Sequence, residues 1–213
     1  MTPKQSSFEF RKHGGPRPGS GRKPKHGKPM VSHLARPKFD GPTPAHVTLR
    51  VVDDVPSLRS SRRFARIRSC FAASRGRFGV RLVEFTVLGN HLHLIVEADG
   101  NEALSRGMQG LAVRLAKALN AALIRSGSLF ADHYHSRLLR TPTELARAIR
   151  YVVENAAHHY GERDYSFTSR APKAIEVLVR PVGWLLIVGW KKAKSHDAMM
   201  PAGLFAEPCL DDA

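Results

Sequence analysis

Residues 80–98, VRLVEFTVLGNHLHLIVEA, are the most informative segment for the fold, because they predict two strands joined by a tight turn. Residues 80–88 are rich in β-branched and aromatic side chains, as strands are. Gly89 and Asn90 form a two-residue turn of the type that joins antiparallel strands. In the second strand, His91, His93 and Ile95 share one face, while residues 92, 94 and 96 are apolar and share the other. We therefore predict a β-hairpin with one apolar face and one open face that carries two histidines.

The segments around this hairpin predict alternating strands and helices. A strand is expected from residue 46 and a helix over 57–75. Apolar residues at three- and four-residue spacing over 104–123 predict a long helix, whose regular part should begin near Leu111 because Gly107 and Gly110 weaken its first turns. A strand over 129–140 and a helix from a Thr141 cap to about residue 159 complete the series. This order predicts a ferredoxin-like α+β fold: a βαββαβ antiparallel sheet with helices on one face, plus a following helix.

Two segments lie outside this domain, which we place at residues 45–160. Residues 1–44 carry ten Lys and Arg against two acidic residues, with many Gly and Pro and no hydrophobic period, so we expect a basic arm that is disordered when free. Residues 15–24 of this arm resemble an AT-hook, with Arg17, Arg22 and Lys23 as DNA contacts; a generic basic arm near phosphates is the alternative. Residues 161–213 form a C-terminal extension, with a strand or helix expected around 174–190.

Charge and cysteine content restrict the function classes. The chain of 213 residues has a formal net charge of +16, which suits a polyanionic partner such as nucleic acid. Cys70 and Cys209 are too few for a disulfide scaffold or a four-thiolate zinc site, and they fit a reducing compartment. No secretory signal is recognised, and the longest clean apolar run, residues 182–190, is far shorter than the ~20 residues that span a bilayer. We expect a soluble cytosolic protein with no membrane contact.

Four residues form the candidate site. His91 and His93 lie side by side on one strand face, and neutral imidazoles bind divalent ions well. Tyr151 and Asn155 are one turn apart on a flank of the last helix, so a phenol and an amide oxygen can point to one ion. Each pair alone also fits a structural role, as half-exposed strand histidines or as a tyrosine at the core edge with a solvated asparagine.

Several stretches of the domain resemble the single-tyrosine transposases of the HUH endonuclease superfamily, which include insertion-sequence enzymes and REP-associated tyrosine transposases. GNHLHLI at 89–95 is similar to their His-hydrophobic-His motif, AHVTLR at 45–50 to their first strand, and FADHYH at 130–135 to the strand before their catalytic helix. YVVEN at 151–155 resembles that helix, with a tyrosine followed four residues later by an amide. The resemblance covers residues 45 to 160 in order.

The resemblance implies a transposase that nicks and joins single-stranded DNA in the bacterial cytosol or nucleoid. Tyr151 would be the nucleophile, giving a 5′-phosphotyrosine intermediate, and His91, His93 and Asn155 would bind Mg²⁺ or Mn²⁺. Some branches of the family have glutamine at the position of Asn155. Hairpin or repeat-end DNA would be the partner. Apart from the resemblance, Arg114 and Lys117 on the basic face of the long helix are candidate DNA contacts; a solvated face is the alternative. The family includes homodimers, so the nucleophile helix can complete its own site or a partner's.

Other interpretations stay open. His133 and His135 can support the site or touch DNA, whereas Tyr134 between them should point to the opposite face. His158 and His159 can reach phosphates or simply end the helix. Trp184 and Trp190 are expected in core packing rather than in base stacking. A non-catalytic, domesticated DNA-binding protein is the main alternative function, while an RNA-binding module would need aromatic residues on the sheet face where the histidines lie.

Overall fold

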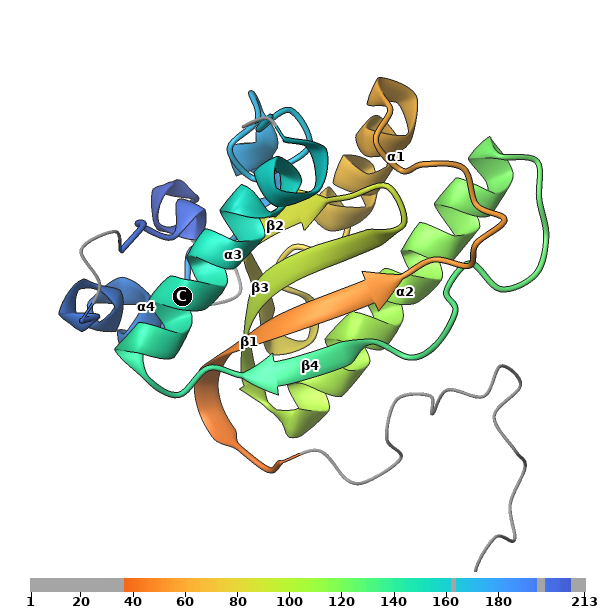
Figure 1. Cartoon of the computed structure of the whole chain (residues 1–213). Coiled ribbons are helices and arrows are strands. Elements are labelled where there is room, and N and C mark those ends of the chain that lie inside the picture. Colours follow the sequence, from red (N-terminus) through yellow and green to blue (C-terminus); the bar gives the residue numbers. More distant parts are fainter. Residues whose placement is uncertain (1–36, 162–163, 195–197, 208–213) are drawn as a thin grey trace, which may run out of the picture. The chain divides into compact units, whose positions relative to one another are not determined.

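The computed structural model describes residues 37–161, 164–194 and 198–207, and its strands form one four-stranded antiparallel sheet (Figure 1). The sheet order is β2-β3-β1-β4. This is the order of a ferredoxin-like sandwich, so the predicted fold class is confirmed. The elements, in chain order, are β1 (Asp40–Arg50), α1 (Ser61–Ala72), β2 (Val80–Val87), β3 (His91–Gly100), α2 (Asn101–Ala122), β4 (His135–Leu138) and α3 (Pro142–Tyr160).

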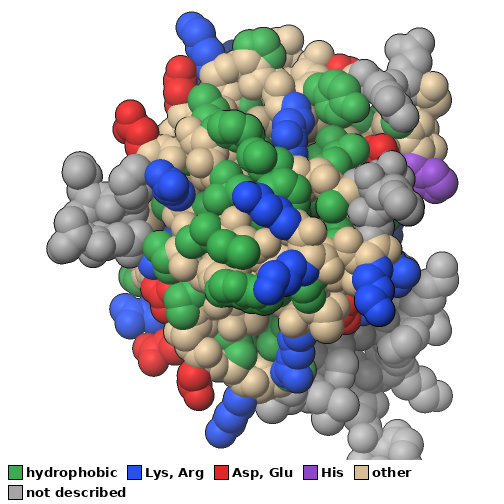
Figure 2. Space-filling model, turned by 90° about the vertical axis from the view of Figure 1, so that its left-hand side faces the viewer, with side chains coloured by type: hydrophobic (Ala, Val, Ile, Leu, Met, Phe, Trp, Pro, Cys, Tyr) green, Lys and Arg blue, Asp and Glu red, His purple; other side chains and the backbone are tan. Residues whose placement is uncertain are grey.

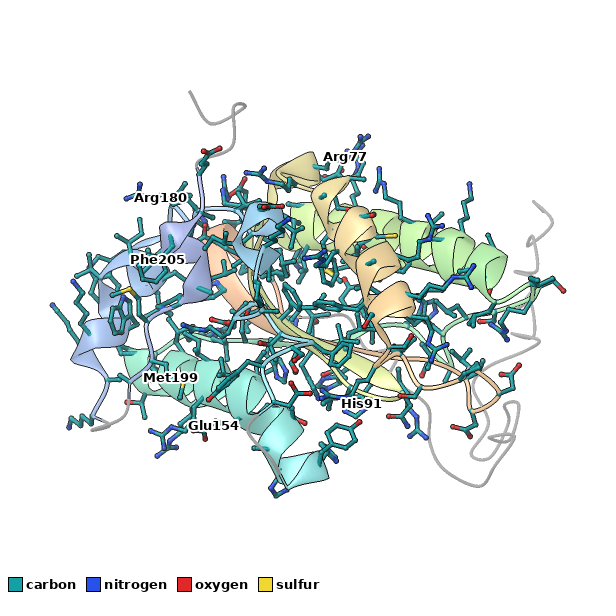
Figure 3. All side chains as sticks on the ribbon, turned by 90° about the horizontal axis from the view of Figure 1, so that it is seen from above. Arg77, His91, Glu154, Arg180, Met199 and Phe205 are labelled. Carbon is teal, nitrogen blue, oxygen red and sulfur yellow. The ribbon has the colours of Figure 1, made fainter. Side chains whose placement is uncertain are left out.

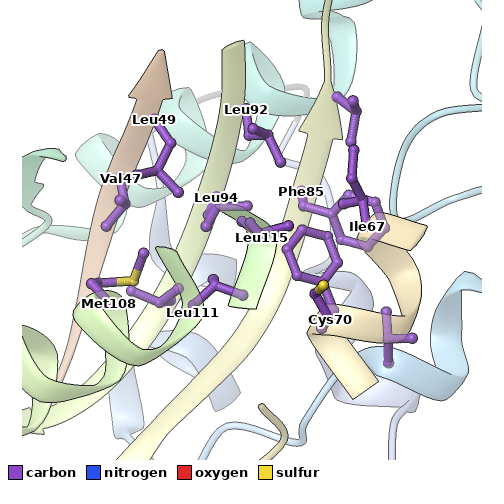
Figure 4. Close-up of a cluster of buried hydrophobic side chains, with 14 of the residues drawn as sticks. Val47, Leu49, Ile67, Cys70, Phe85, Leu92, Leu94, Met108, Leu111 and Leu115 are labelled. Atoms are coloured by element: carbon purple, nitrogen blue, oxygen red, sulfur yellow. The ribbon is translucent and has the colours of Figure 1, made fainter. Parts of the chain in front are cut away.

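The first core lies between one sheet face and the helices α1 and α2. Because side chains alternate along a strand, β1 and β3 send every second residue to this face. Val47, Leu92 and Leu94 are fully buried there, as the alternation predicts. They pack in one cluster with Ile67 of α1 and Leu115 of α2 (Figure 4). This layer holds the hairpin rigidly, so the opposite face of β3 has a fixed position.

The helix α2 begins ten residues before the predicted start of its regular part. It is helical from Asn101, although Gly107 and Gly110 lie within it. A Cβ at Gly107 would stand 2.5 Å from Val80 Cγ2, so glycine is required for the close approach of α2 to β2. Tertiary packing at Gly107 thus outweighs the roughly 1 kcal/mol that glycine costs in a helix.

The strands at the β1–β4 edge differ in length from their predictions. β1 begins at Asp40, inside the segment assigned to the basic arm, and pairs with β3 from there. β4 spans only His135–Leu138 rather than 129–140, although Val51 still bridges Phe130. Between these pairings the Asp132 side chain accepts a hydrogen bond from the His133 amide at 2.7 Å, and the local turn interrupts the ladder.

The helix α3 covers the other face of the sheet (Figure 1), so the predicted open histidine face is partly closed. Its start agrees with the sequence: Thr141 accepts a hydrogen bond from the Glu144 amide, and Pro142 occupies the first turn. Glu144 in turn accepts from the Arg140 amide at 2.9 Å. Ile149 and Val152 of α3 pack with Val83 and Ile95 of the sheet in a second core, and this core fixes which side of α3 faces β3.

The C-terminal extension folds into short helical turns rather than a strand. They are η2 (Ala174–Val177), α4 (Trp184–Ile187), η3 (Gly189–Lys192) and η4 (Ala202–Phe205); a further turn, η1 (Arg77–Gly79), precedes β2. Two fully buried carboxylates attach the extension to the sheet. Glu84 binds Arg170 and the Ala202 amide, and Glu97 accepts from the amides of residues 182 and 183. In the described part of the chain no helix is both long and apolar enough to cross a membrane.

The two tryptophans of the extension differ in environment. Trp190 is buried and packs against α3 in the second core, as expected. Trp184 is 55% exposed, which contradicts its predicted core packing. Lys192 Nζ lies 5.4 Å from the centre of the Trp184 ring. Figure 2 views the molecule from the side of α4 and shows Lys and Arg side chains standing among hydrophobic ones.

Candidate active site

The two histidines of β3 face α3 rather than solvent. In the sheet register His91 lies opposite Arg50 and His93 opposite Thr48. Their ring centres are 4.8 Å apart with perpendicular planes, so the two imidazoles converge. His93 is 5% exposed and His91 is half-buried. Figure 3 shows His91 beside the C-terminal half of α3, on the side of the molecule opposite Arg77.

Each of these histidines uses its Nδ1 atom within the protein. His91 Nδ1 lies 2.6 Å from the side-chain oxygen of Asn90. His93 Nδ1 lies 3.1 Å from both the Thr48 hydroxyl and His46 Nε2. The Nε2 atom of His93 is buried without a hydrogen-bond partner in the protein. Contacts at Nδ1 leave Nε2 as the nitrogen available to a ligand.

Burial keeps the imidazoles of the site neutral. It lowers the pKa of His93 to about 3, with smaller contributions from His46, His91 and His159. It lowers the pKa of His46 to about 4, assisted by His135 and Arg137. The pKa of His91 is lowered in the same way. Since a metal binds the neutral imidazole, these shifts favour the ligating form at neutral pH.

The helix α3 brings Tyr151 and Asn155 to the same place. The Tyr151 ring centre lies 5.2 Å from that of His93, in an edge-to-face contact within one chain. Tyr151 is 47% exposed, so its phenol is accessible. Asn155 is only 2% exposed, and neither polar atom of its amide has a hydrogen-bond partner in the protein. The solvated asparagine considered from sequence is therefore wrong, since Asn155 is buried one helical turn from Tyr151.

These residues suit a divalent cation. A buried amide oxygen and a buried imidazole nitrogen without partners are costly unless something binds them. His93 Nε2 and Asn155 Oδ1 are such atoms. Imidazole and amide oxygen together are acceptable ligands for Mg²⁺ or Mn²⁺. Over the described ranges no group of three or more His, Cys, Asp or Glu side chains could hold a metal, so this donor set depends on the amide.

The basic residues beside the site are not those expected from sequence. A hollow of about 320 Å³ on α3 is lined by Arg147, Arg150, Tyr151, Glu154, Asn155 and His158. Arg114 and Lys117 belong to α2, which packs on the opposite face of the sheet, so the structure does not bring them to the site. Arg17, Arg22 and Lys23 of the basic arm lie outside the described residues.

The pairing of the strands determines where several other histidines and tyrosines of the domain lie. Tyr134 is buried in the first core, away from the histidine face, as predicted. β4 pairs with β1 rather than with β3, so His135 lies opposite Thr48 at the exposed edge and His133 is exposed before the strand. His159 at the end of α3 lies 5.8 Å from the His91 ring. The Tyr160 hydroxyl accepts a hydrogen bond from the Gly89 amide and ties α3 to the hairpin turn.

Sequence reasoning missed His46 and Thr48 as parts of the site. Both lie on β1 with the same period-2 phase, so a signal for a shared face was present. What the sequence does not show is that β1 is the neighbour of β3 and aligns Thr48 with His93. Arg147 and Arg150 were likewise not singled out, although they precede Tyr151 by four residues and one residue on α3.

Comparison with known proteins identifies the fold. No family model and no curated protein matches the chain. A solved REP-associated tyrosine transposase bound to a REP hairpin aligns with a TM-score of 0.54 at 14% identity, over 66% of this chain and 83% of that one. A structure described as a transposase of Deinococcus radiodurans aligns with a TM-score of 0.40 at 14% identity, over 55% of this chain and 90% of that one. The first alignment shows that the chain has the fold of a tyrosine transposase.

Proposed function

We propose that this chain is a single-tyrosine transposase of the HUH type, which nicks and joins single-stranded DNA through a 5′-phosphotyrosine intermediate. One observation carries the proposal. Tyr151 meets His93 beside a buried Asn155, and the polar atoms of Asn155 and His93 Nε2 lack protein partners. The chain that carries this arrangement has the fold of a REP-associated tyrosine transposase. Burying polar atoms without a partner is costly, and their presence on two residues of the proposed donor set favours a bound ligand there.

We assign the metal site to three side chains. His91 and His93 would bind through Nε2 and Asn155 through Oδ1, since Nδ1 of each histidine is already in contact with a protein atom. Mg²⁺ or Mn²⁺, when bound, would polarise the scissile phosphate and offset the charge that develops on its oxygens.

Tyr151 supplies the nucleophile. Its phenolic oxygen forms a bond to phosphorus and the bond from phosphorus to the 3′ oxygen breaks. The phenolic proton is lost to solvent, and the departing 3′ oxygen takes up a proton to become a hydroxyl. The phosphate stays attached to the 5′ side of the nick and to the protein. A second 3′ hydroxyl can reverse the same exchange and join a new strand, so no external energy source is needed.

The DNA contacts follow from the side chains around Tyr151. Arg147, Arg150 and His158 line the hollow beside it, and guanidinium groups suit phosphate oxygens. The neighbour in the comparison is bound to a REP hairpin. We therefore propose a hairpin with a single-stranded flank as substrate, with the flank next to α3, in the cytosol or nucleoid where such DNA is found.

The experiment is a covalent trapping assay. The full chain is incubated with a labelled hairpin oligonucleotide and Mg²⁺ or Mn²⁺, then denatured and separated by size. The wild type should form a denaturation-resistant adduct that chelator abolishes. Tyr151→Phe should form none, whereas Tyr165→Phe, at an exposed tyrosine away from the histidines, should react normally.

Each outcome of that assay decides between functions. An adduct that persists in Tyr151→Phe, or that is indifferent to His91→Ala and to chelator, would refute the mechanism. Tight hairpin binding by the wild type without any adduct would instead support a domesticated, non-catalytic DNA-binding protein.

A further inference from the structure

His46 makes two ring contacts at the centre of the site. Its ring lies beside that of His93, with centres 5.2 Å apart and planes inclined by 29°. It also meets the Tyr151 ring edge-on at 5.6 Å. His46 Nε2 lies 3.1 Å from His93 Nδ1, within hydrogen-bond distance. His46 therefore touches both the candidate ligand and the candidate nucleophile without belonging to either assigned set.

The proton between the two histidines decides whether His93 can bind a metal. A neutral imidazole carries one proton, on either Nδ1 or Nε2. If His46 Nε2 accepts a hydrogen bond, the proton of His93 is on Nδ1 and its Nε2 lone pair is free. If His46 Nε2 donates instead, the proton of His93 is on Nε2, and that nitrogen cannot bind a cation.

We propose that His46 is a positioning residue, which accepts a hydrogen bond from His93 Nδ1 and so directs the lone pair of His93 Nε2 toward the metal. The inference rests on the proposed function, because it assigns His93 as a ligand. The buried and unpartnered His93 Nε2 fits this arrangement, since a cation can satisfy a lone pair at that atom but cannot satisfy a proton there. Partners of this kind orient metal-binding histidines in many proteins.

Thr48 is the second neighbour of His93 Nδ1, so its role has to be distinguished from that of His46. Its hydroxyl lies 3.1 Å from the same nitrogen and is able either to accept or to donate a hydrogen bond. A rotating hydroxyl does not by itself select one form of the imidazole. The His46 ring also restricts the orientation of His93, because the two ring planes are inclined by only 29°. We therefore assign the orienting role to His46 and a supporting role to Thr48.

The test measures the form of His93 and the metal affinity separately. The full chain is labelled with ¹⁵N-histidine, and long-range proton–nitrogen spectra without metal report which nitrogen of His93 is protonated. Mn²⁺ affinity is then measured by titration. In the wild type we expect the Nδ1-protonated form. His46→Leu should give a mixture of forms and weaken Mn²⁺ binding by on the order of 10–100-fold. His46→Gln, whose amide oxygen can accept the same hydrogen bond, should restore both.

Two comparisons keep the test decisive. His133→Leu makes the same replacement at an exposed histidine and should leave the His93 spectrum and Mn²⁺ affinity unchanged. The proposal is overturned if His46→Leu keeps the wild-type form and affinity, or if Thr48→Val changes them as much as His46→Leu does. Failure of the wild type to form a DNA adduct would refute the proposed function, while the spectra and the titration still decide the role of His46.

Discussion

Asn155→Leu should make the metal-free protein more stable, although it removes a polar residue that we assign to the site. Asn155 is 2% exposed, and both its amide oxygen and its amide nitrogen lack hydrogen-bond partners in the protein. Leucine keeps the branched arrangement of four side-chain heavy atoms, so it leaves no cavity, although its methyl groups are larger than the amide atoms. It also replaces the unpaired amide by an apolar side chain at a buried position of α3, where Val152 and Ala156 are buried as well.

The magnitude follows from the cost of burying a polar group without a partner. Such a group costs about 1–3 kcal/mol. Because the two atoms belong to one amide, we expect a gain of about 2 kcal/mol in the free energy of unfolding. For a chain of this size that is roughly 4–8 °C in melting temperature. Saturation with Mn²⁺ at 100 times its Kd should add about 2.7 kcal/mol to the wild type, and it should add much less to Asn155→Leu.

Thermal and urea unfolding in chelator, and then with increasing Mn²⁺, measure both effects. The matched control is Asn120→Leu, because the Asn120 amide donates to the Gly127 carbonyl at 2.9 Å and accepts from Arg125 at 2.8 Å. That variant should lose about 1 kcal/mol or more of stability. A loss of stability by Asn155→Leu in chelator would show that the amide is satisfied without metal. Equal stabilisation of both proteins by Mn²⁺ would show that Asn155 is not a ligand.

Three further predictions concern the sheet, α2 and α3. Burial, opposed by Arg170, raises the pKa of Glu84 to about 7 from an ordinary 4.5, so its contribution to stability is complete below pH 4.5 and is lost as the pH rises through 7. Between pH 4.5 and 8 the wild type should therefore lose about 3 kcal/mol in its free energy of unfolding, whereas Glu84→Gln should not. Equal pH slopes in urea unfolding of the two proteins would contradict this. Gly107→Ala should destabilise the protein by about 1–3 kcal/mol, because the added Cβ would clash with Val80. At Gly110 the nearest atom belongs to the flexible end of Arg114, so Gly110→Ala should be neutral or stabilising by up to about 1 kcal/mol. Thermal melts that show the same shift for both variants would refute the packing argument. Arg147→Ala should reduce adduct formation and its salt dependence while Mn²⁺ affinity is unchanged, and a titration showing weaker Mn²⁺ binding would place Arg147 in the metal site instead.

Sequence alone determined the elements that depend on local patterning. The period-2 alternation around His91 and His93 correctly separated the core face of β3 from the site face, and the Thr141 cap correctly started α3. The Tyr151–Asn155 spacing placed both residues on adjacent turns of one helix. These features follow from helix and strand geometry, which every residue in the element obeys whatever packs against it.

Which residues the elements bring together depends on the packing of the folded chain. The pairing of β1 with β3 puts His46 and Thr48 against His93, and no local pattern states which strands are neighbours. The packing of α3 on the sheet turned Asn155 inward and closed a face predicted to be open. From sequence, Gly107 is expected to weaken the helix, whereas in the folded chain it permits close packing of α2 against Val80. Burial and register arise between segments distant in sequence, and therefore the environment of each site residue appears only when the chain is folded.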